Sequence, residues 1–132
     1  VEDYLLTSTI NAILAQRLVR TLGKGAREKV QLLPEVAAEI GFGNFLEQDS
    51  YTVYRPIATE ENPTGYYGRT SILELLKMTD SIRRLIMQQA TSGEIHDMAV
   101  QQGMRTMYQD GLLKCLQGTT TLEEVLRVTQ ES

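Results

Sequence analysis

The sequence has little of several residue types that support special chemistry. It contains no tryptophan, one cysteine and one histidine in 132 residues. A single cysteine excludes an internal disulfide and supplies too few thiolates for a zinc site, so a reducing compartment such as the cytosol is expected. Cys115, in a predicted helix between Leu113 and Leu116, is interpreted as a small buried hydrophobe rather than a reactive thiol. His96 has no partner of known type, which favours an incidental histidine over a catalytic one.

Long apolar runs and an excess of basic charge are also missing. No segment approaches the length that spans a bilayer, and the start at Val1-Glu2-Asp3 has no signal-peptide pattern. The formal net charge of −4 argues against a nucleic-acid binder that depends on neutralising phosphates. No serine, cysteine or lysine forms a recognisable nucleophile motif. Because Val1 stands where a methionine would begin a protein, we expect a piece of a longer chain.

The length of 132 residues fits about one domain with a modest core. The stretch from Gly65 to Leu76 organises it, because two glycines flank Tyr66-Tyr67 and allow a sharp turn. From Thr70 to Leu76 apolar residues occupy both alternation phases, which predicts a central strand covered on both faces. Arg69 opens that strand. It is either a solvated or ion-paired residue, or a cationic group aimed at phosphate or at a neighbouring subunit.

The N-terminal part predicts a helix followed by a strand. From Asp3, the apolar residues Leu6, Ile10, Ile13 and Leu14 share one helical face, and alternation then predicts a strand from Leu14 to Leu22. The pentad 23–27 breaks this strand. Its glycines and lysine invite a phosphate-loop interpretation, but the Gly-x-x-x-x-Gly-Lys-Ser/Thr spacing is absent, so a flexible turn is favoured.

An insertion follows, up to about Thr64. A short helix is predicted from Pro34 to a stop at Gly41, with Phe42 and Phe45 packing it down. An edge strand is predicted from Tyr51 to Ile57, limited by Pro56. In the polar loop that follows, Glu60 and Glu61 are interpreted as a solvated charge pair rather than a cation site.

Four short helices are predicted after the central strand. Capping residues indicate where each helix starts, and glycines indicate where two of them end. The first helix starts at Asp80 or Ser81; the second runs from Thr91-x-x-Glu94 to Gly103; the third runs from Thr106-x-x-Gln109 to Gly118; and the fourth starts at Thr121-x-x-Glu124. Their predicted inward residues are Ile82, Leu85, Ile86 and Ala90, then Ile95, Met98 and Ala99, then Tyr108, Leu112, Cys115 and Leu116, and finally Leu122, Val125 and Leu126. Met98, Met104 and Met107 suit adaptable helix packing.

Several motifs together resemble one family. They are Ala15-Gln16-Arg17-Leu18-Val19-Arg20, Gly65-Tyr66-Tyr67-Gly68-Arg69-Thr70 with Glu74-Leu75-Leu76, Gly103-Met104-Arg105-Thr106, Asp110-Gly111-Leu112, and the stretch from Gly118 to Thr129. In this order they resemble the C-terminal region of secretion ATPases, the hexameric traffic ATPases that power type II secretion and type IV pilus assembly. The resemblance covers nearly the whole chain. Residues 122–131 look more like the type II secretion branch than the pilus branch.

The resemblance implies a mixed α/β fold in three parts. Residues 1–22 would be the last helix and strand of a RecA-like P-loop ATPase core, residues 23–64 a small inserted subdomain, and residues 65–132 the central strand with a helical C-terminal subdomain. Family members commonly bind zinc in the insertion through two Cys-x-x-Cys pairs. Here Gly23 and Ala26 replace the first pair, and 58–62 contain no cysteine. We therefore predict no zinc, and an insertion that holds together by packing or is mobile.

The resemblance also implies a function for a longer parent protein. The parent would hydrolyse ATP with Mg²⁺ as a homo-hexamer, in the cytoplasm at the inner membrane, with inner-membrane secretion components as partners and no nucleic acid. The phosphate loop, acidic metal motif and catalytic glutamate of the family are all absent, so no catalytic residue is assigned and this segment alone is predicted inactive. Arg69, then Arg17 and Arg20, are the candidates for a contact at a subunit boundary or with phosphate.

Two other functional hypotheses remain open. One is a non-enzymatic interaction module whose helices bind a partner helix in an exposed methionine-rich groove. The other, a small DNA-binding helical domain, is disfavoured by the acidic charge.

Overall fold

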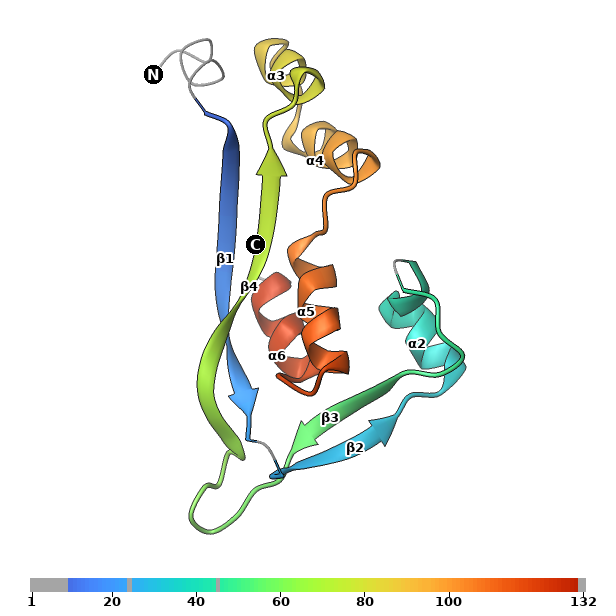
Figure 1. Cartoon of the computed structure of the whole chain (residues 1–132), viewed down its shortest axis with the longest axis vertical. Coiled ribbons are helices and arrows are strands. Elements are labelled where there is room, and N and C mark those ends of the chain that lie inside the picture. The colour runs from blue at the N-terminus through green and yellow to red at the C-terminus, as the bar shows by residue number, and fades with distance from the viewer. Residues whose placement is uncertain (1–9, 24, 45, 131–132) are drawn as a thin grey trace. The chain divides into compact units, whose positions relative to one another are not determined.

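The computed structural model describes residues 10–23, 25–44 and 46–130. The chain forms two compact units, each built from separate pieces of sequence: unit 1 contains 1–15 and 73–106, and unit 2 contains 16–72 and 107–132. The predicted division into 1–22, 23–64 and 65–132 stays a prediction. In chain order the elements are β1 (Ala12–Leu22), β2 (Arg27–Gln31), α2 (Pro34–Ile40), the 3-10 turn η1 (Phe42–Asn44), β3 (Thr52–Pro56), β4 (Tyr66–Lys77), α3 (Asp80–Met87), α4 (Ser92–Gln101), α5 (Met107–Leu116) and α6 (Leu122–Thr129) (Figure 1).

Strand β1 begins earlier than the sequence pattern predicts. Ile13 and Leu14, predicted on a helical face, lie within β1, so the helix prediction is wrong there; its part before Ile10 lies outside the described residues. The backbone carbonyl of Asn11 accepts a hydrogen bond from the Met78 amide at 2.8 Å. This bond lies beside the paired ends of β1 and β4, and pairing of this kind overrides a short helical periodicity.

Strand β4 contains the predicted central strand, but it is not central among the described residues. It belongs to a two-stranded sheet with β1. Ile72 is fully buried, whereas Leu73 is 38% exposed and Leu75 46% exposed. The prediction of a strand is confirmed, and the prediction that both faces are covered is wrong for the part of the chain that the structure describes. Apolar residues at both odd and even positions show that either face of the strand is suited to burial. They do not show that both faces are covered within the described residues.

The insertion forms a β-hairpin-like pair and a short helix. Strands β2 and β3 pair antiparallel with Val30 opposite Val53. Helix α2 starts with Pro34 and ends at Gly41, whose φ of 102° is a left-handed value that glycine adopts without strain. The predicted helix and edge strand are therefore confirmed. A strand, not a helix, follows Gly25, so the phosphate-loop interpretation is wrong.

The core of unit 2 joins the insertion to α5 and α6. Its buried residues come from all these parts: Ala37, Phe42, Tyr51, Val53, Leu112, Cys115 and Val125. Phe42 stacks on Tyr51 with ring centroids 5.0 Å apart. The insertion was predicted either to hold together by packing or to be mobile, and packing is the alternative observed. Phe45, predicted to pack against the short helix, lies outside the described residues. A second cluster joins Val19, Ile72 and Val128, with Met107 packed against it.

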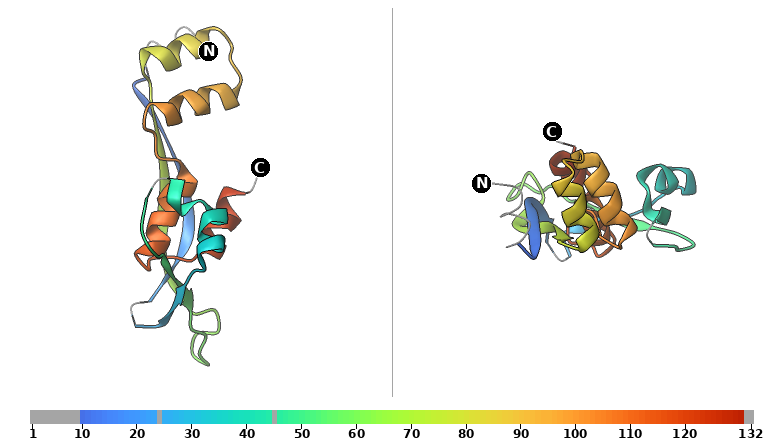
Figure 2. Two further views of the ribbon diagram at one scale, coloured as in Figure 1. Left: turned by 90° about the vertical axis from the view of Figure 1, so that its right-hand side faces the viewer. Right: turned by 90° about the horizontal axis from the view of Figure 1, so that it is seen from above.

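Helices α5 and α6 approach each other closely at a glycine. A Cβ atom added to Gly111 would lie 2.6 Å from Cγ1 of Val125, a distance that side-chain atoms do not tolerate. Burial of Leu112, Cys115 and Val125 confirms the predicted inner faces of these helices. Cys115 is a buried hydrophobe as predicted, and burial raises the pKa of its thiol to about 12. Figure 2 shows α5 and α6 within unit 2 from two further directions.

Unit 1 has a smaller core between α3, α4 and the ends of the strands. Met78, Ile82 and Ala99 are buried, and Met98 and Met104 pack against them. Met107 packs in the second cluster of unit 2, so all three methionines serve helix packing as predicted. Figure 2 shows α3 and α4 lying against each other, joined by a short loop.

The caps of α3 and α4 are local and largely as predicted. At Thr91 the capping box is complete, with the hydroxyl accepting from the Glu94 amide and the Glu94 side chain bonding back. Helix α3 is capped by Thr79, whose hydroxyl accepts from the Ile82 amide, rather than by Asp80 or Ser81. The cap therefore lies one residue earlier than predicted. Thr79 can serve as the cap because its backbone is extended, the conformation that a capping residue needs.

Candidate functional site

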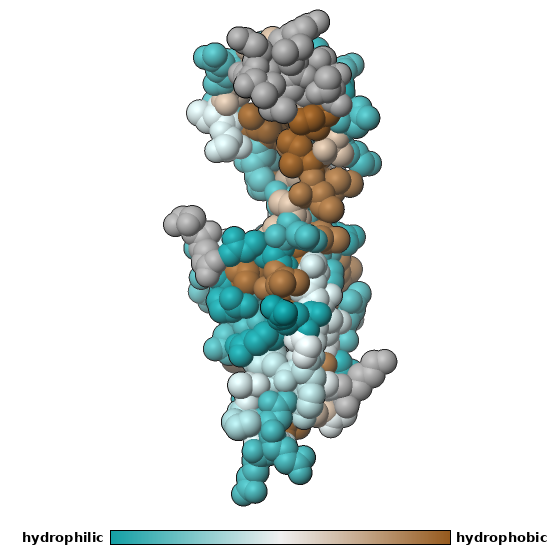
Figure 3. Space-filling view, turned by 90° about the vertical axis from the view of Figure 1, so that its left-hand side faces the viewer, coloured by the Kyte–Doolittle hydropathy of each residue, from teal (hydrophilic) through white to brown (hydrophobic). Residues whose placement is uncertain are grey.

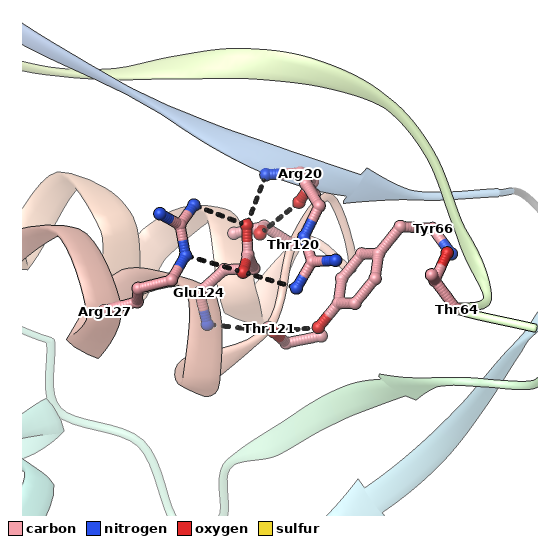
Figure 4. A network of polar contacts seen from close by, with 7 residues as sticks. All are labelled: Arg20, Thr64, Tyr66, Thr120, Thr121, Glu124 and Arg127. Carbon is pink, nitrogen blue, oxygen red and sulfur yellow. Dashed lines mark hydrogen bonds and ion pairs between the residues drawn. The ribbon is translucent and has the colours of Figure 1, made fainter.

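The site with the strongest electrostatics surrounds Glu124 in the first turn of α6. Thr121 caps this helix, and its hydroxyl accepts a hydrogen bond from the Glu124 amide at 3.2 Å. The sequence predicts that the carboxylate of Glu124 completes a capping box. It accepts hydrogen bonds from two arginines instead, so only half of the predicted box forms. We call Arg20, Tyr66, Thr120, Thr121, Glu124 and Arg127 the Glu124 cluster (Figure 4).

Two arginines from different elements converge on the buried carboxylate. From β1, the Arg20 backbone amide donates to Oε1 at 2.7 Å and Nη2 donates to Oε2 at 3.0 Å. From the next turn of α6, Nε and Nη2 of Arg127 donate to Oε2 and Oε1 at 3.1 and 3.0 Å. The Glu124 side chain is only 1% exposed. A carboxylate this buried is stable because each of its oxygens accepts two hydrogen bonds, at least one of them from a charged guanidinium.

The charge state of Glu124 depends on two opposing effects, burial and hydrogen bonding. Burial alone would raise its pKa, but hydrogen bonds from Arg127 and Arg20 outweigh burial and hold the pKa at about 2. The hydrogen bond with Glu124 raises the pKa of Arg20 in turn. Glu124 is therefore ionised at neutral pH and too weakly basic to serve as a general base. What the cluster does chemically is to fix a guanidinium in place.

The aromatic ring of Tyr66 supports Arg20 from another side. The guanidinium carbon lies 4.2 Å from the ring centroid, a favourable cation–π position. The Tyr66 hydroxyl shares a hydrogen bond with the Thr121 hydroxyl at 2.9 Å, so the ring is itself anchored at the start of α6. Burial raises the pKa of Tyr66. The Arg20 side chain remains 44% exposed, and its orientation is fixed while part of it faces solvent.

The turn before α6 also bonds to the backbone at the end of β1. The Thr120 hydroxyl donates to the Arg20 carbonyl at 2.7 Å. The Leu22 amide donates to the Thr119 carbonyl at 2.9 Å. Together with the Arg20 amide, these bonds occupy one edge of the strand from Arg20 to Leu22.

The three predicted arginines have different surroundings. Arg69 on β4 is exposed, and its side chain makes no hydrogen bond or ion pair within the described residues. Arg17 on β1 is exposed too, whereas Arg20 belongs to the Glu124 cluster. Their role at a subunit boundary or with phosphate stays a prediction. Sequence reasoning missed Arg127 and the burial of Glu124, although an acid and a base three residues apart on a helix were the available signal.

Other candidate residues have simpler roles. His96 has a partner after all, since its Nε2 lies 3.9 Å from Oε1 of Glu74 on β4, and the interpretation as a partnerless histidine is wrong. Glu60 and Glu61 are exposed in their loop. Across residues 10–23, 25–44 and 46–130 there is no group of three or more acidic, histidine or cysteine side chains placed to hold a metal ion. No helix in these same ranges is long and apolar enough to cross a membrane.

Comparison with known proteins agrees with the resemblance seen in the motifs. The family described as Type II/IV secretion system protein matches residues 1–127. The chain belongs to this family. It is 52% identical over its whole length to Type II secretion system protein E of Xanthomonas campestris, of which it covers 23%. It is 34% identical to the Type IV pilus assembly ATPase PilB of Pseudomonas aeruginosa over 99% of its length, again covering 23% of that protein.

A third relative shows how far the family similarity extends. The PilB ATPase of Thermus thermophilus is 38% identical over 99% of this chain, which covers 15% of it. The chain thus spans less than a quarter of the length of these secretion-family relatives. Their names include both type II secretion and pilus assembly.

Proposed function

We propose that the chain is the C-terminal portion of a hexameric secretion ATPase whose parent hydrolyses ATP to drive pseudopilus assembly in type II secretion. The observation that carries this proposal is the 52% identity to a type II secretion system protein E along the whole chain. The parent would act in the cytoplasm, at the inner membrane, with ATP and Mg²⁺ as cofactors. Inner-membrane components of the secretion machinery would be its partners.

The uncovered side chains of unit 1 support a place at the border of a larger RecA-like core. Ile13, Leu14, Leu73 and Leu75 are between 38% and 57% exposed. Figure 3 shows hydrophobic side chains gathered on the face that it displays. Isolated two-stranded sheets are marginal in water, and exposed apolar groups of this kind usually mark an interface. The remainder of the parent would supply the cover.

Within this proposal the segment contributes geometry rather than chemistry. Its 132 residues contain no Gly-x-x-x-x-Gly-Lys-Ser/Thr motif, and the buried carboxylate of Glu124 has a pKa of about 2. The exposed guanidinium of Arg69 would reach a phosphate or a facing carboxylate across a subunit boundary. Arg20, held in a fixed orientation by Glu124 and Tyr66, is suited to the same task, and Arg17 is the third candidate.

The first experiment measures ATP hydrolysis and assembly of the full-length protein. We expect ATPase activity, a hexamer in the presence of nucleotide, and a Walker A motif upstream of Val1. The 132-residue chain by itself should show no turnover. A full-length protein without the motif or without hydrolysis would refute the proposed function, and turnover by the isolated chain would refute the assignment of catalysis to the remainder.

The second experiment tests Arg69 in the full-length protein. Arg69→Ala should lower kcat by about tenfold or more with little change in thermal stability, because loss of one charge-assisted contact in a transition state has effects of this order. Arg84→Ala is the matched control, since the Arg84 side chain is also exposed and makes no hydrogen bond or ion pair within the described residues. Equal activity of the two variants would remove Arg69 from the boundary.

Type IV pilus assembly is the second candidate function, favoured by the PilB relatives at 34% and 38% identity. Complementation separates the two. The gene should restore secretion to a strain that lacks its type II secretion ATPase and should not restore pili to a strain that lacks PilB. The opposite result would select pilus assembly. The match to the secretion family disfavours the hypothesis of a non-enzymatic interaction module.

A further inference from the structure

The β2–β3 pair of the insertion begins and ends beside the two segments where the family resemblance implies cysteine pairs. Arg27 at the start of β2 lies opposite Pro56 at the end of β3, and we call these paired ends the hairpin base. The connection 23–26 leads into this base and the loop 58–65 leads out of it. A structural zinc ion held by the two segments would need about four sulfur, nitrogen or carboxylate ligands.

The side chains of the two segments do not fit such an ion. Gly23 and Ala26 have no ligating side-chain atom. The two glutamates of the loop, at 60–61, are exposed, and two carboxylates are fewer ligands than a structural zinc site uses. On β2, both carboxylate oxygens of Glu28 accept hydrogen bonds from Arg55 at 3.1 Å. The contacts that hold the hairpin base are therefore of another kind.

Arg27 attaches the start of β2 to the turn between α5 and α6. Its Nη1 donates to the Gly118 carbonyl at 2.6 Å. Its guanidinium carbon lies 4.6 Å from the centroid of the Tyr54 ring on β3, a favourable cation–π position. No side chain fits at residue 118, because a Cβ atom there would lie 2.7 Å from Cζ of Arg27. The arginine thus contacts both the hairpin and the α5–α6 turn, all within unit 2.

The end of β1 is attached to the same turn. The amide of Leu22, the last residue of β1, donates to the Thr119 carbonyl at 2.9 Å. The consecutive carbonyls of Gly118 and Thr119 therefore accept hydrogen bonds from Arg27 and Leu22, the residues that flank the connection 23–26. The first of the two segments is in this way fixed at both of its ends without a ligand.

The second segment is folded around Asn62. The Asn62 Nδ2 donates to the Tyr66 carbonyl at 2.9 Å, and Oδ1 accepts from the Thr64 hydroxyl at 3.1 Å. The Asn62 amide donates to the Thr59 hydroxyl at 2.9 Å, and the Asn62 carbonyl accepts from the Gly65 amide at 3.1 Å. Because a side-chain amide offers donors and acceptors together, one residue connects the start of the loop to its end.

We propose that Arg27 and Asn62 hold the hairpin base in place of a metal ion, so that the insertion keeps its fold without zinc. Arg27 attaches the first segment to the α5–α6 turn through a charge-assisted hydrogen bond, which is stronger than one between neutral groups. Asn62 closes the second segment on itself. The inference rests on contacts within unit 2 and does not require the proposed ATPase activity.

Chelation of the full-length protein tests whether a metal supports the base. The amides of Leu22 and Gly65 report on the two segments, because they donate to Thr119 and Asn62. Their hydrogen exchange should change by less than about twofold after treatment with phenanthroline, which removes zinc and leaves Mg²⁺. Exchange that becomes about tenfold faster at either amide would show a structural metal and overturn the proposal. Zinc bound elsewhere in the full-length protein would leave both amides unchanged.

Substitution of Arg27 tests the attachment of the first segment. Arg27→Ala should speed exchange at Leu22 by about tenfold, since Leu22 donates to the carbonyl next to the one that Arg27 binds. Arg55→Ala is the matched control, because Arg55 lies on the same hairpin and makes an exposed ion pair with Glu28. Equal exchange at Leu22 in the two variants would overturn the role of Arg27.

The amide of buried Cys115 shows whether these variants remain folded. If Arg27→Ala also speeds exchange at Cys115, the milder Arg27→Lys replaces it, since lysine keeps a charged donor but lacks the planar group that lies over Tyr54. Arg27→Lys should speed exchange at Leu22 by about threefold and leave Cys115 unchanged. An unchanged Leu22 in this variant would overturn the role of Arg27.

Substitution of Asn62 tests the second segment. The Gly65 amide donates to both the carbonyl and Oδ1 of Asn62, so Asn62→Ala should speed exchange at Gly65 by about tenfold and leave Leu22 unchanged. Asn62→Asp keeps the acceptor for Gly65 and should have a smaller effect. Glu61→Ala, next to Asn62 in the exposed loop, is the control. If Asn62→Ala and Glu61→Ala affect Gly65 equally, Asn62 does not hold the loop and the proposal is wrong.

Discussion

The two units are stabilised in different ways. In unit 1 the capping box of Thr91 and Glu94 is a local and exposed contact between residues three apart, beside longer-range contacts such as that of His96 with Glu74. In unit 2 the main polar contact is buried and joins Arg20 to Glu124, 104 residues further along the chain. Local contacts of this kind contribute about 1 kcal/mol each, whereas breaking a buried charged contact costs several times more. Substitutions with the same chemistry should therefore have larger effects in unit 2.

The largest effect is expected at Glu124. Glu124→Ala should lower the free energy of unfolding by about 4 kcal/mol, because it leaves two guanidinium groups and the Arg20 amide without their acceptor. Glu123→Ala, in the same turn of α6 but exposed, is the control and should change stability by less than about 0.5 kcal/mol. Urea unfolding followed by circular dichroism measures both. Equal effects would show that the Glu124 cluster does not stabilise the chain.

Acid should remove the same contribution gradually. The pKa of Glu124 is lowered from 4.5 to about 2, so its stabilisation is complete above about pH 4.5 and is lost as pH falls toward 2. The loss amounts to about 3 kcal/mol. Urea unfolding at several pH values should show the difference between the native chain and Glu124→Gln shrinking over this range. A difference that stays constant down to pH 2 would contradict the lowered pKa.

The glycines of two helices offer a second comparison between the units. Gly111→Ala in α5 should cost about 2 kcal/mol, since its Cβ would lie 2.6 Å from Cγ1 of Val125. Gly93→Ala in α4 has no atom closer than 3.9 Å to the new Cβ and should stabilise by about 0.5 kcal/mol. Thermal unfolding of both variants provides the measurement. Opposite signs are expected, and a loss at both positions would contradict the open surroundings of Gly93.

The smallest difference concerns two threonine caps. Thr91→Ala should cost about 1 kcal/mol and Thr121→Ala about 1 kcal/mol more, because Thr121 is buried and also bonds to the Tyr66 hydroxyl. Thr→Ser at each position keeps the hydroxyl and should recover most of the loss. If Thr91→Ala proves the more damaging, the contrast between exposed and buried caps does not hold.

The contrast between local and long-range contacts explains which elements could be predicted from the sequence. The helices after β4 were predictable because each start is encoded within four residues, as in Thr91 to Glu94, and each inner face by spacing. Strand β2 was missed because four of its five residues, Arg27–Gln31, carry polar side chains, so the strand depends on pairing with β3. The start of β1 was misassigned for the same reason, since pairing with β4 determines it.

The candidate site was harder to predict than the fold. Arg20 was selected from a family motif, but its partner Glu124 had a sufficient local explanation as half of a capping box. Only the tertiary structure brings the two together. Long-range pairs leave no periodic trace in a sequence, so neither the burial of Glu124 nor the participation of Arg127 followed from the pattern. The family match establishes kinship, Arg69→Ala in the full-length protein tests the boundary role of Arg69, and the role of Arg17 stays a prediction.

The environment of Cys115 has a practical consequence for labelling this protein. Its thiol is fully buried, and with a pKa of about 12 it carries almost no thiolate at neutral pH. Maleimide dyes react with accessible thiolates, so a cysteine introduced on an exposed loop of this segment can be labelled selectively while Cys115 stays in place. Fluorescent reporters can thus be attached without first altering the native core.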